Sequence, residues 1–198
     1  MGVRSKNMNS IGPIKSSFLS CEKDLETIVR KLFIESKPYN ETLKRLLIIN
    51  TKDCIDDLTN PVYKEKIDEI SIKDLVDKGY IRTAPKIEFG ENEEVKSYLI
   101  ISFDNFTANK ENPEFRDCIV EIDILCHTDY WDVGNFRQRP IKIMGYIDGI
   151  LNESKLSGIG TLNFIGANEL TLSDTLSGYC LMYAAIHGSD DIIPGDDD

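Results

Sequence analysis

The sequence has very few histidines, which limits the chemistry that it can perform. Only His127 and His187 occur among its 198 residues, so a catalytic design that depends on histidine has two candidates at most. The five cysteines are widely spaced and form no C-x-x-C pair. This spacing gives no support to a disulfide framework or a zinc knuckle, and we expect reduced thiols in a cytosolic setting.

Positive charge is also scarce, because 23 lysines and arginines stand against 34 acidic residues, a net charge of −11. Proteins that read nucleic acids usually carry a basic face instead. No apolar run approaches the roughly 20 residues that cross a bilayer, and no apolar signal segment opens the chain. Gly158-Ile159-Gly160 lacks the lysine and the helix of a phosphate-binding loop. We therefore expect no nucleic-acid reader, no membrane-spanning protein and no nucleotide-driven motor.

A chain of 198 residues fits one domain with a sizeable core. Residues 1–17 are polar and contain Gly12-Pro13, which predicts a flexible arm. Residues 18–188 are predicted to form a single domain. The acidic segment 189–198 is predicted to be a tail that only a partner would order.

Helical spacing of apolar residues predicts a helix over 21–36, after a possible N-cap at Ser20. A short helix is predicted over 71–78, closed by Gly79. A longer helix is predicted over 135–152, and its true start lies near Arg139 because Pro140 fits the first turn. Segment 43–49 is compatible with either a helix or a strand.

The clearest strand spans 116–126, where Cys118, Val120, Ile122 and Ile124 alternate with polar residues. This alternation predicts one buried face and one solvated or subunit-facing side. We expect an α+β fold with a mixed, mainly antiparallel sheet of about four to six strands packed by helices. The other predicted strands are 80–89 and 95–103, joined as a hairpin by an acidic turn at 91–94, then 158–165, 169–172 and 178–187, with a long polar connection over 104–115.

Asp123, His127 and Asp129 are the best candidates for a divalent-metal site or for a base and its orienting partner. The competing interpretation, which we favour, is that His127 begins a loop and caps backbone groups, because a third ligand at a defined spacing is missing. Glu121 and Asp123 share a strand face, as in some metal-dependent nucleases, but no lysine lies in register. We expect no metal and no cofactor, and keep a small divalent-metal-dependent hydrolase or nuclease as the alternative.

Aromatic residues bracket two polar loops, and Tyr130 and Trp131 lie together in one of them. Such side chains are favoured interface anchors because they bury a large area at a low entropic cost. Folding of the tryptophan back over the core is the alternative. Arg137 and Arg139 stand at a helix start, where their charge opposes the helix dipole. The predicted subunit or partner contacts are Phe106, Phe115, Tyr130, Trp131, Arg137 and Arg139.

Over roughly residues 80–188 the order of these segments resembles that of phage tail terminators and related tail-completion or neck proteins. The resemblance lies in order and spacing, and the chain differs from the smaller members by an insertion around 50–80. The matching pieces are Val120-Glu121-Ile122-Asp123-Ile124, Arg139 with Ile141-Lys142-Ile143, Ile147-Asp148-Gly149-Ile150-Leu151, Leu162-Asn163-Phe164 and Tyr179-Cys180-Leu181-Met182-Tyr183.

The resemblance implies a non-enzymatic structural protein of the virion, assembled in the host cytoplasm. It implies a homohexameric ring that caps the growing tail tube and joins it to the head. Its partners would be copies of itself, the tail tube protein and the head connector, with DNA passing through unbound. Acidic side chains at the lumen would repel phosphate; the candidates are Asp104, Glu111, Glu114, Asp117, Glu121 and Asp123. The charge alone would also fit an acidic mimic of nucleic acid.

Overall fold

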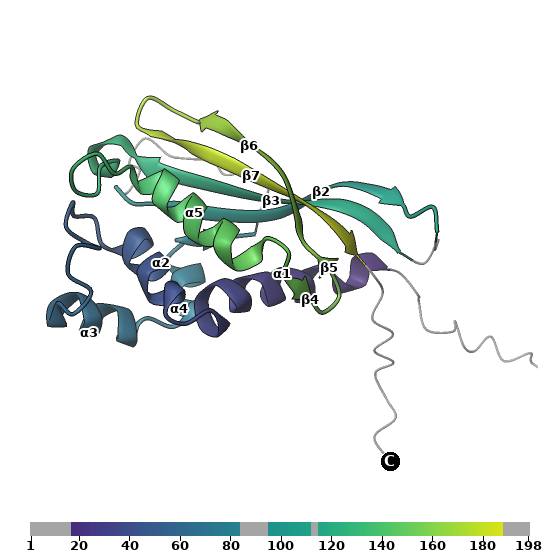
Figure 1. Cartoon of the computed structure of the whole chain (residues 1–198), viewed down its shortest axis with the longest axis horizontal. Coiled ribbons are helices and arrows are strands. Elements are labelled where there is room, and N and C mark those ends of the chain that lie inside the picture. The colour runs from purple at the N-terminus through teal and green to yellow at the C-terminus, as the bar shows by residue number, and fades with distance from the viewer. Residues whose placement is uncertain (1–16, 84–94, 112–114, 188–198) are drawn as a thin grey trace, which may run out of the picture.

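A five-stranded sheet with helices packed against one face forms the body of the protein (Figure 1). The computed structural model describes residues 17–83, 95–111 and 115–187. The strands follow the order β1-β2-β3-β7-β6, and all neighbours are antiparallel except β1 and β2. This confirms the predicted α+β fold and its mixed, mainly antiparallel sheet. The strands are β1 (Ile81–Arg82), β2 (Tyr98–Ala108), β3 (Arg116–His127), β6 (Asn163–Thr171) and β7 (Leu176–His187), and β4 (Lys155–Leu156) pairs with β5 (Gly160–Thr161) in a separate ribbon.

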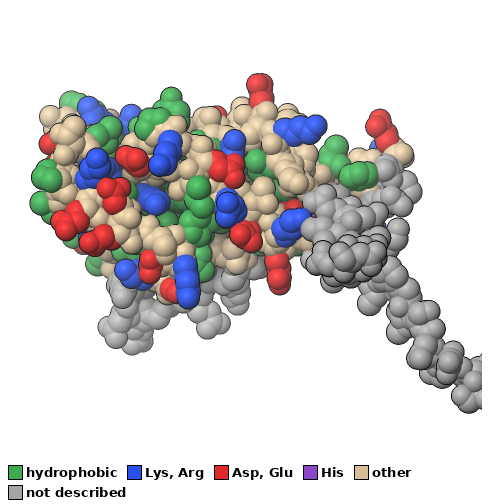
Figure 2. Space-filling view, turned by 90° about the horizontal axis from the view of Figure 1, so that it is seen from below, with side chains coloured by type: hydrophobic (Ala, Val, Ile, Leu, Met, Phe, Trp, Pro, Cys, Tyr) green, Lys and Arg blue, Asp and Glu red, His purple; other side chains and the backbone are tan. Residues whose placement is uncertain are grey.

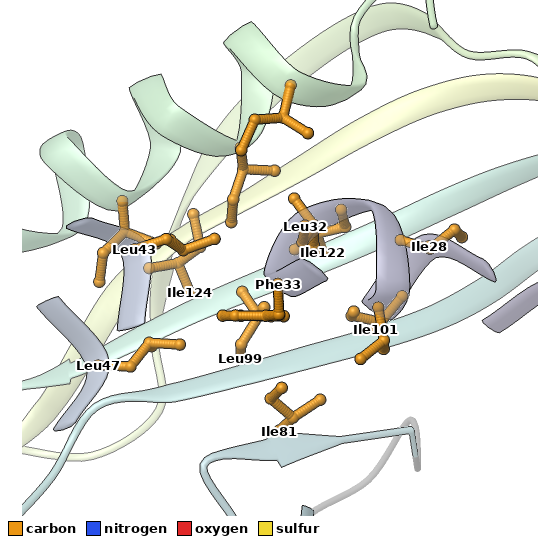
Figure 3. Packing of buried hydrophobic residues seen from close by; sticks show 14 of the residues in the cluster. Ile28, Leu32, Phe33, Leu43, Leu47, Ile81, Leu99, Ile101, Ile122 and Ile124 are labelled. Carbon is orange, nitrogen blue, oxygen red and sulfur yellow. The ribbon is translucent and has the colours of Figure 1, made fainter. Parts of the chain in front are cut away.

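Strand β3 is the centre of the sheet, paired with β7 along its whole length and with β2 along most of it. Its alternating pattern behaves as predicted: Val120, Ile122 and Ile124 are completely buried, whereas the alternate positions Asp117 to Asp123 are only partly buried. The buried side chains meet the helices in one core (Figure 3). Apolar burial of this kind stabilises by roughly 25 cal/mol per Å², so this inner face holds sheet and helices together.

The helices are α1 (Cys21–Arg30), continued by the π-helical turn η2 (Lys31–Glu35), then α2 (Tyr39–Ile48), α3 (Pro61–Glu69), α4 (Ile72–Asp77) and α5 (Arg139–Leu151), with 3-10 turns η1 (Ser17–Ser20) and η3 (Thr128–Tyr130). The helix predicted over 21–36 is therefore confirmed as α1 with η2. The ambiguous segment 43–49 belongs mostly to helix α2. Figure 3 shows Leu32 and Phe33 from η2 and Leu43 and Leu47 from α2 packed over the sheet.

Local chemistry explains where two short helices begin. At α4, the Ser71 side chain accepts from the Asp74 backbone N–H, and the Asp74 carboxylate accepts from the Ser71 backbone N–H at 2.9 Å. This capping box satisfies two backbone donors that the first turn would otherwise leave unpaired. Helix α3, which the sequence pattern did not predict, begins with an Asn60 cap and Pro61 in its first turn.

Three strand predictions are wrong. Ile81 and Arg82 pair in parallel with Leu99 and Ile100, so β1 and β2 are not an antiparallel hairpin, and residues 84–94 lie outside the described ranges. Strand β2 continues to Ala108 through a bulge and a left-handed residue at Asn105, in what was expected to be loop. Strand β6 continues across the turn expected at 166–168, because residues 166–171 pair with β7 in a regular register after a shift between Phe164 and Gly166.

A buried polar contact joins α1 to the end of the last strand. His187 Nδ1 lies 2.5 Å from Asp24 Oδ2, and both side chains are almost inaccessible. Cys21 Sγ approaches the other ring nitrogen at 3.6 Å, and the rings of Phe103 and Phe106 pack against the imidazole. The contact fixes the start and the end of the described chain at one end of the sheet.

None of the helices within the described ranges has the length and apolar character that a membrane span requires.

Candidate functional site

The predicted contact residues fall at two opposite ends of the molecule. Phe106 and Phe115 lie near the start of β3, whereas Tyr130 and Trp131 follow its end. The 12 residues of β3 span about 40 Å at the usual rise per residue. We call the end that carries residues 104–111 and 115–118 the hairpin end, at the right of Figure 1, and the end formed by loops 50–60 and 128–138 the loop end, at the left.

Arg139 is completely buried at the loop end, which corrects the expectation that it contacts another subunit. Its Nη1 donates to the carbonyl oxygens of Leu46 at 2.6 Å and Ile49 at 3.1 Å. Its Nη2 donates to the carbonyl oxygen of Thr51 at 2.9 Å, and its Nε donates to that of Tyr130 at 2.7 Å. The planar guanidinium has five donors and suits this task. Arg139 therefore holds the end of α2 and the loop before α5 in one arrangement.

A second buried arginine, Arg45, holds the adjoining loop. Its guanidinium donates to the carbonyls of Asp57 at 3.1 Å and Leu58 at 2.7 Å. On the surface, Arg137 pairs with Asp56 at 2.9 Å and links loop 50–60 to loop 128–138. The two loops are thus fixed by contacts within the chain. Arg137 was predicted to pair with an acidic residue of a neighbouring subunit, but it pairs with Asp56 of its own chain.

The loop end presents large apolar side chains to solvent. Phe136 is fully exposed, at 108% of its reference area, and Leu58 and Val62 are 54% and 69% exposed. The Phe136 backbone is left-handed, with φ of 59°, which is rare for a bulky residue. Strain of this kind concentrates at functional positions. The turn signal Gly134-Asn135 places Phe136 in a loop, but no pattern in the sequence tells that its ring faces outward.

Trp131 and Tyr130 are less exposed than Phe136. Trp131 is partly buried and packs against the main core, in agreement with the alternative that the tryptophan folds back over the core. Its carbonyl accepts a hydrogen bond from the Arg139 backbone N–H at 2.6 Å. The Tyr130 carbonyl is bound by the Arg139 side chain. Both residues shape the loop that carries Phe136, whatever contact they make with a partner.

At the hairpin end, Phe106 packs within the chain. Its ring lies 5.0 Å from that of Phe18, edge to face, and 5.8 Å from that of Phe103. Phe115 is 36% exposed. Phe18 and Ile186 at this end are exposed as well, so the hairpin end also presents apolar side chains to solvent.

Acidic residues follow the sheet face that points away from the helices. Asp104, Glu121 and Asp123, which we call the acid row, lie on β2 and β3. Burial raises the pKa of Glu121, and the nearby carboxylates of Asp104 and Asp123 raise it further. Burial also raises the pKa of Asp123, against a hydrogen bond with Cys180.

The remaining predicted lumen acids are more scattered. Asp117 shares the outer sheet face but accepts a hydrogen bond from Asn109 at 2.7 Å. Glu111 is exposed at the tip of the hairpin end, and Glu114 lies outside the described residues. The structure thus brings three of the six acids into one row.

Removing the charge of two acid-row residues, Glu121 and Asp123, should stabilise the monomer. A carboxyl whose pKa is higher in the folded than in the unfolded chain lowers stability as pH rises from about 4 through the folded pKa. The double change Glu121→Gln and Asp123→Asn should therefore raise the Tm at pH 7 by about 2–4 °C, corresponding to about 1 kcal/mol after solvent screening.

The pH dependence is the sharper readout for this double variant. Near pH 3 all these carboxyls are protonated in both states, so thermal melts of variant and wild type should converge there. Glu65→Gln, on the exposed surface of α3, is the control and should leave the melts unchanged. A variant with the wild-type Tm at pH 7 would show that the acid row carries no electrostatic cost.

The alternative metal site is not assembled. Asp123 and His127 are four residues apart on β3, about 14 Å along the strand. His127 Nδ1 accepts from the Asp129 backbone N–H at 3.2 Å and so caps η3, as the favoured interpretation predicted. Within the described ranges, no group of three histidine, cysteine or acidic side chains is placed to hold a metal.

A groove lies on the solvent side of α5, beside the start of α2. Its volume is about 460 Å³, and its apolar walls come from Tyr39, Ile141, Tyr146 and Ile150. The rings of Tyr39 and Tyr146 are 6.2 Å apart. Figure 2 shows the surface from another side, where basic, acidic and hydrophobic side chains intermingle among the described residues without a continuous basic area.

Comparison with known proteins gives a family match. The sequence model of the family YomW, a phage-associated family, matches residues 40–185. A comparison with curated proteins found no match. Among solved structures, a chain from "Virion of native gene transfer agent (GTA) particle" is similar, with 10% identity and a TM-score of 0.38 over 64% of this chain and 91% of that one. That TM-score is too low to bear on function.

Proposed function

Because the chain belongs to the phage-associated YomW family, we propose that it is a structural protein of the phage virion that forms a ring at the neck or the tail end. In this role, that of a tail terminator or tail-completion protein, it seals the tail tube and joins it to the head. Its chemistry is binding, and it turns over no substrate.

One observation carries the proposal beyond the family: the loop end presents apolar side chains on a backbone that is fixed in advance. Phe136, Leu58 and Val62 are exposed, while the buried guanidinium groups of Arg45 and Arg139 hold the loops that display them. Preorganised apolar anchors bind at a low entropic cost. This surface is suited to a protein partner and has no use in a soluble monomer.

The acid row fits the passage of DNA through such a ring. Asp104, Glu121 and Asp123 lie together on one sheet face, and like charges at a pore wall would keep phosphate from adhering. In the proposed ring this face lines the lumen. Acidic residues outnumber basic ones and give a net charge of −11, which does not favour binding to DNA.

The decisive experiment uses the phage. Purified virions should contain the protein at a fixed number of copies relative to the tail tube protein, as measured by quantitative mass spectrometry. Deleting the gene should give tubes of uncontrolled length and heads without tails in electron micrographs, because nothing caps the tube or joins it to the head. Intact virions that lack the protein would overturn the proposal.

A further inference from the structure

The surface of this chain contains both a knob and a groove that would accept it. The knob is the fully exposed ring of Phe136, and the groove is the cavity of about 460 Å³ on α5. We propose that Phe136 of one copy inserts into the α5 groove of a second copy. This inference rests on the proposed function, because it names the contact that would join neighbours in the ring.

The floor of the groove is open for an incoming ring. Gly145 and Gly149 lie one turn apart on the exposed side of α5, and a Cβ added to either would meet no atom within 4 Å. The apolar walls of Tyr39 and Tyr146 stand beside them. An aromatic side chain buries 150–250 Å² and gains most from such an apolar, concave site.

Charge complementarity identifies the occupant. Lys142 is the one charged residue among those that line the groove, and it is exposed. Around the knob, the side chains of Asp129 and Asp132 are exposed, whereas Arg137 is already paired with Asp56. Seating the knob therefore brings acids toward a lysine, which favours this chain's own loop end over an arbitrary apolar peptide.

The contact must be between copies, because Phe136 stands outside the groove of its own chain. Knob and groove are different surfaces, so the contact is heterologous, and repeated heterologous contacts close into a ring when the rotation between subunits allows. The fixed loop matters here, since a mobile phenylalanine would lose part of the binding energy in being ordered.

The test removes the knob and fills the groove in separate variants. Phe136→Ser should raise the protomer concentration for half-assembly at least tenfold, measured by mass photometry and sedimentation velocity. Gly145→Leu should weaken assembly as much, because its side chain occupies the floor. It should also raise the Tm of the monomer, since leucine favours a helical conformation more than glycine does. Stability and assembly would then change in opposite directions.

Phe164→Ser is the matched control, because it removes an exposed phenylalanine of β6 that belongs to neither the knob nor the groove. It should leave the assembly unchanged. A direct readout comes from mixing isotope-labelled Asn135→Cys chains with unlabelled Ile141→Cys chains under air oxidation, because both variants keep the Phe136 ring and Gly145. A disulfide between a labelled and an unlabelled peptide, found by mass spectrometry, would report the contact.

Each outcome decides between the contact and the function. Wild-type protein that stays monomeric at 100 µM, or a Phe136→Ser variant that assembles normally, overturns the contact. A monomeric protein that is nevertheless present in virions overturns the contact and leaves the proposed function standing. If assembly needs both Phe136 and an empty groove, the contact is confirmed. If the same protein is absent from virions, the proposed function is overturned.

Discussion

Replacing Arg139 with methionine should lower the free energy of unfolding by about 3–5 kcal/mol. The guanidinium donates to four backbone carbonyls, those of Leu46, Ile49, Thr51 and Tyr130. Methionine fills much of the volume but donates nothing, so the two buried carbonyls of Leu46 and Ile49 and the two partly buried carbonyls of Thr51 and Tyr130 lose their partner. Each unsatisfied buried acceptor costs about 1–3 kcal/mol, less whatever water or relaxation recovers.

Urea unfolding followed by the fluorescence of Trp131, the only tryptophan in the chain, measures this change next to the substituted residue. Arg137→Met is the matched control, two positions away. It breaks a half-exposed ion pair with Asp56 and should cost about 0–1 kcal/mol. Equal losses in the two variants would show that the buried guanidinium is not what holds the loop end. Arg139→Lys should recover only part of the loss, because an ammonium cannot reach four carbonyls in a plane.

Replacing Gly178 with alanine should destabilise the sheet by at least about 4 kcal/mol, or prevent folding altogether. Gly178 lies on β7 opposite Leu125 of β3. A Cβ there would overlap the carbonyl oxygen of Ile124 and press on its carbonyl carbon. The obstacle is backbone in the central strand, which cannot move aside without breaking its ladders with β2 and β7.

Gly166→Ala is the control for the same substitution one strand away. Its Cβ would make an ordinary contact with the end of the Met182 side chain at 3.7 Å, so the change in stability should stay within about 1 kcal/mol. Far-ultraviolet circular dichroism and thermal melts of both variants make the comparison. A Gly178→Ala protein with the wild-type Tm would mean that β3 and β7 are farther apart at this point.

Periodicity predicted the parts of the fold whose side chains alternate between core and solvent. Strand β3 and helices α1 and α5 were predicted close to their observed bounds because their apolar residues recur at the strand or helix period. Helix α3 was missed because Ile67 is its only buried residue, which leaves no apolar stripe. The parallel pairing of β1 was missed because a two-residue strand has no period.

The candidate site was less accessible to sequence reasoning. Phe136 lies in the loop before α5 and Arg139 is the first residue of that helix, yet Arg139 is completely buried and Phe136 completely exposed. Which polar or aromatic side chain turns inward depends on carbonyls contributed by α2, some 90 residues earlier in the chain. No local sequence pattern indicates a contact between residues so far apart in the chain. The roles of these two residues therefore follow from the tertiary structure alone.

The continuous pairing of β3 has a consequence for how the protein would fit between neighbours. A strand that is paired along its whole length with β7 and along most of its length with β2 resists bending and stretching. The exposed ring of Phe136 at the loop end and the Asp24–His187 contact at the hairpin end are therefore kept at a constant distance from each other. If the chain forms the proposed ring, the number of residues in β3 would set the height of that ring.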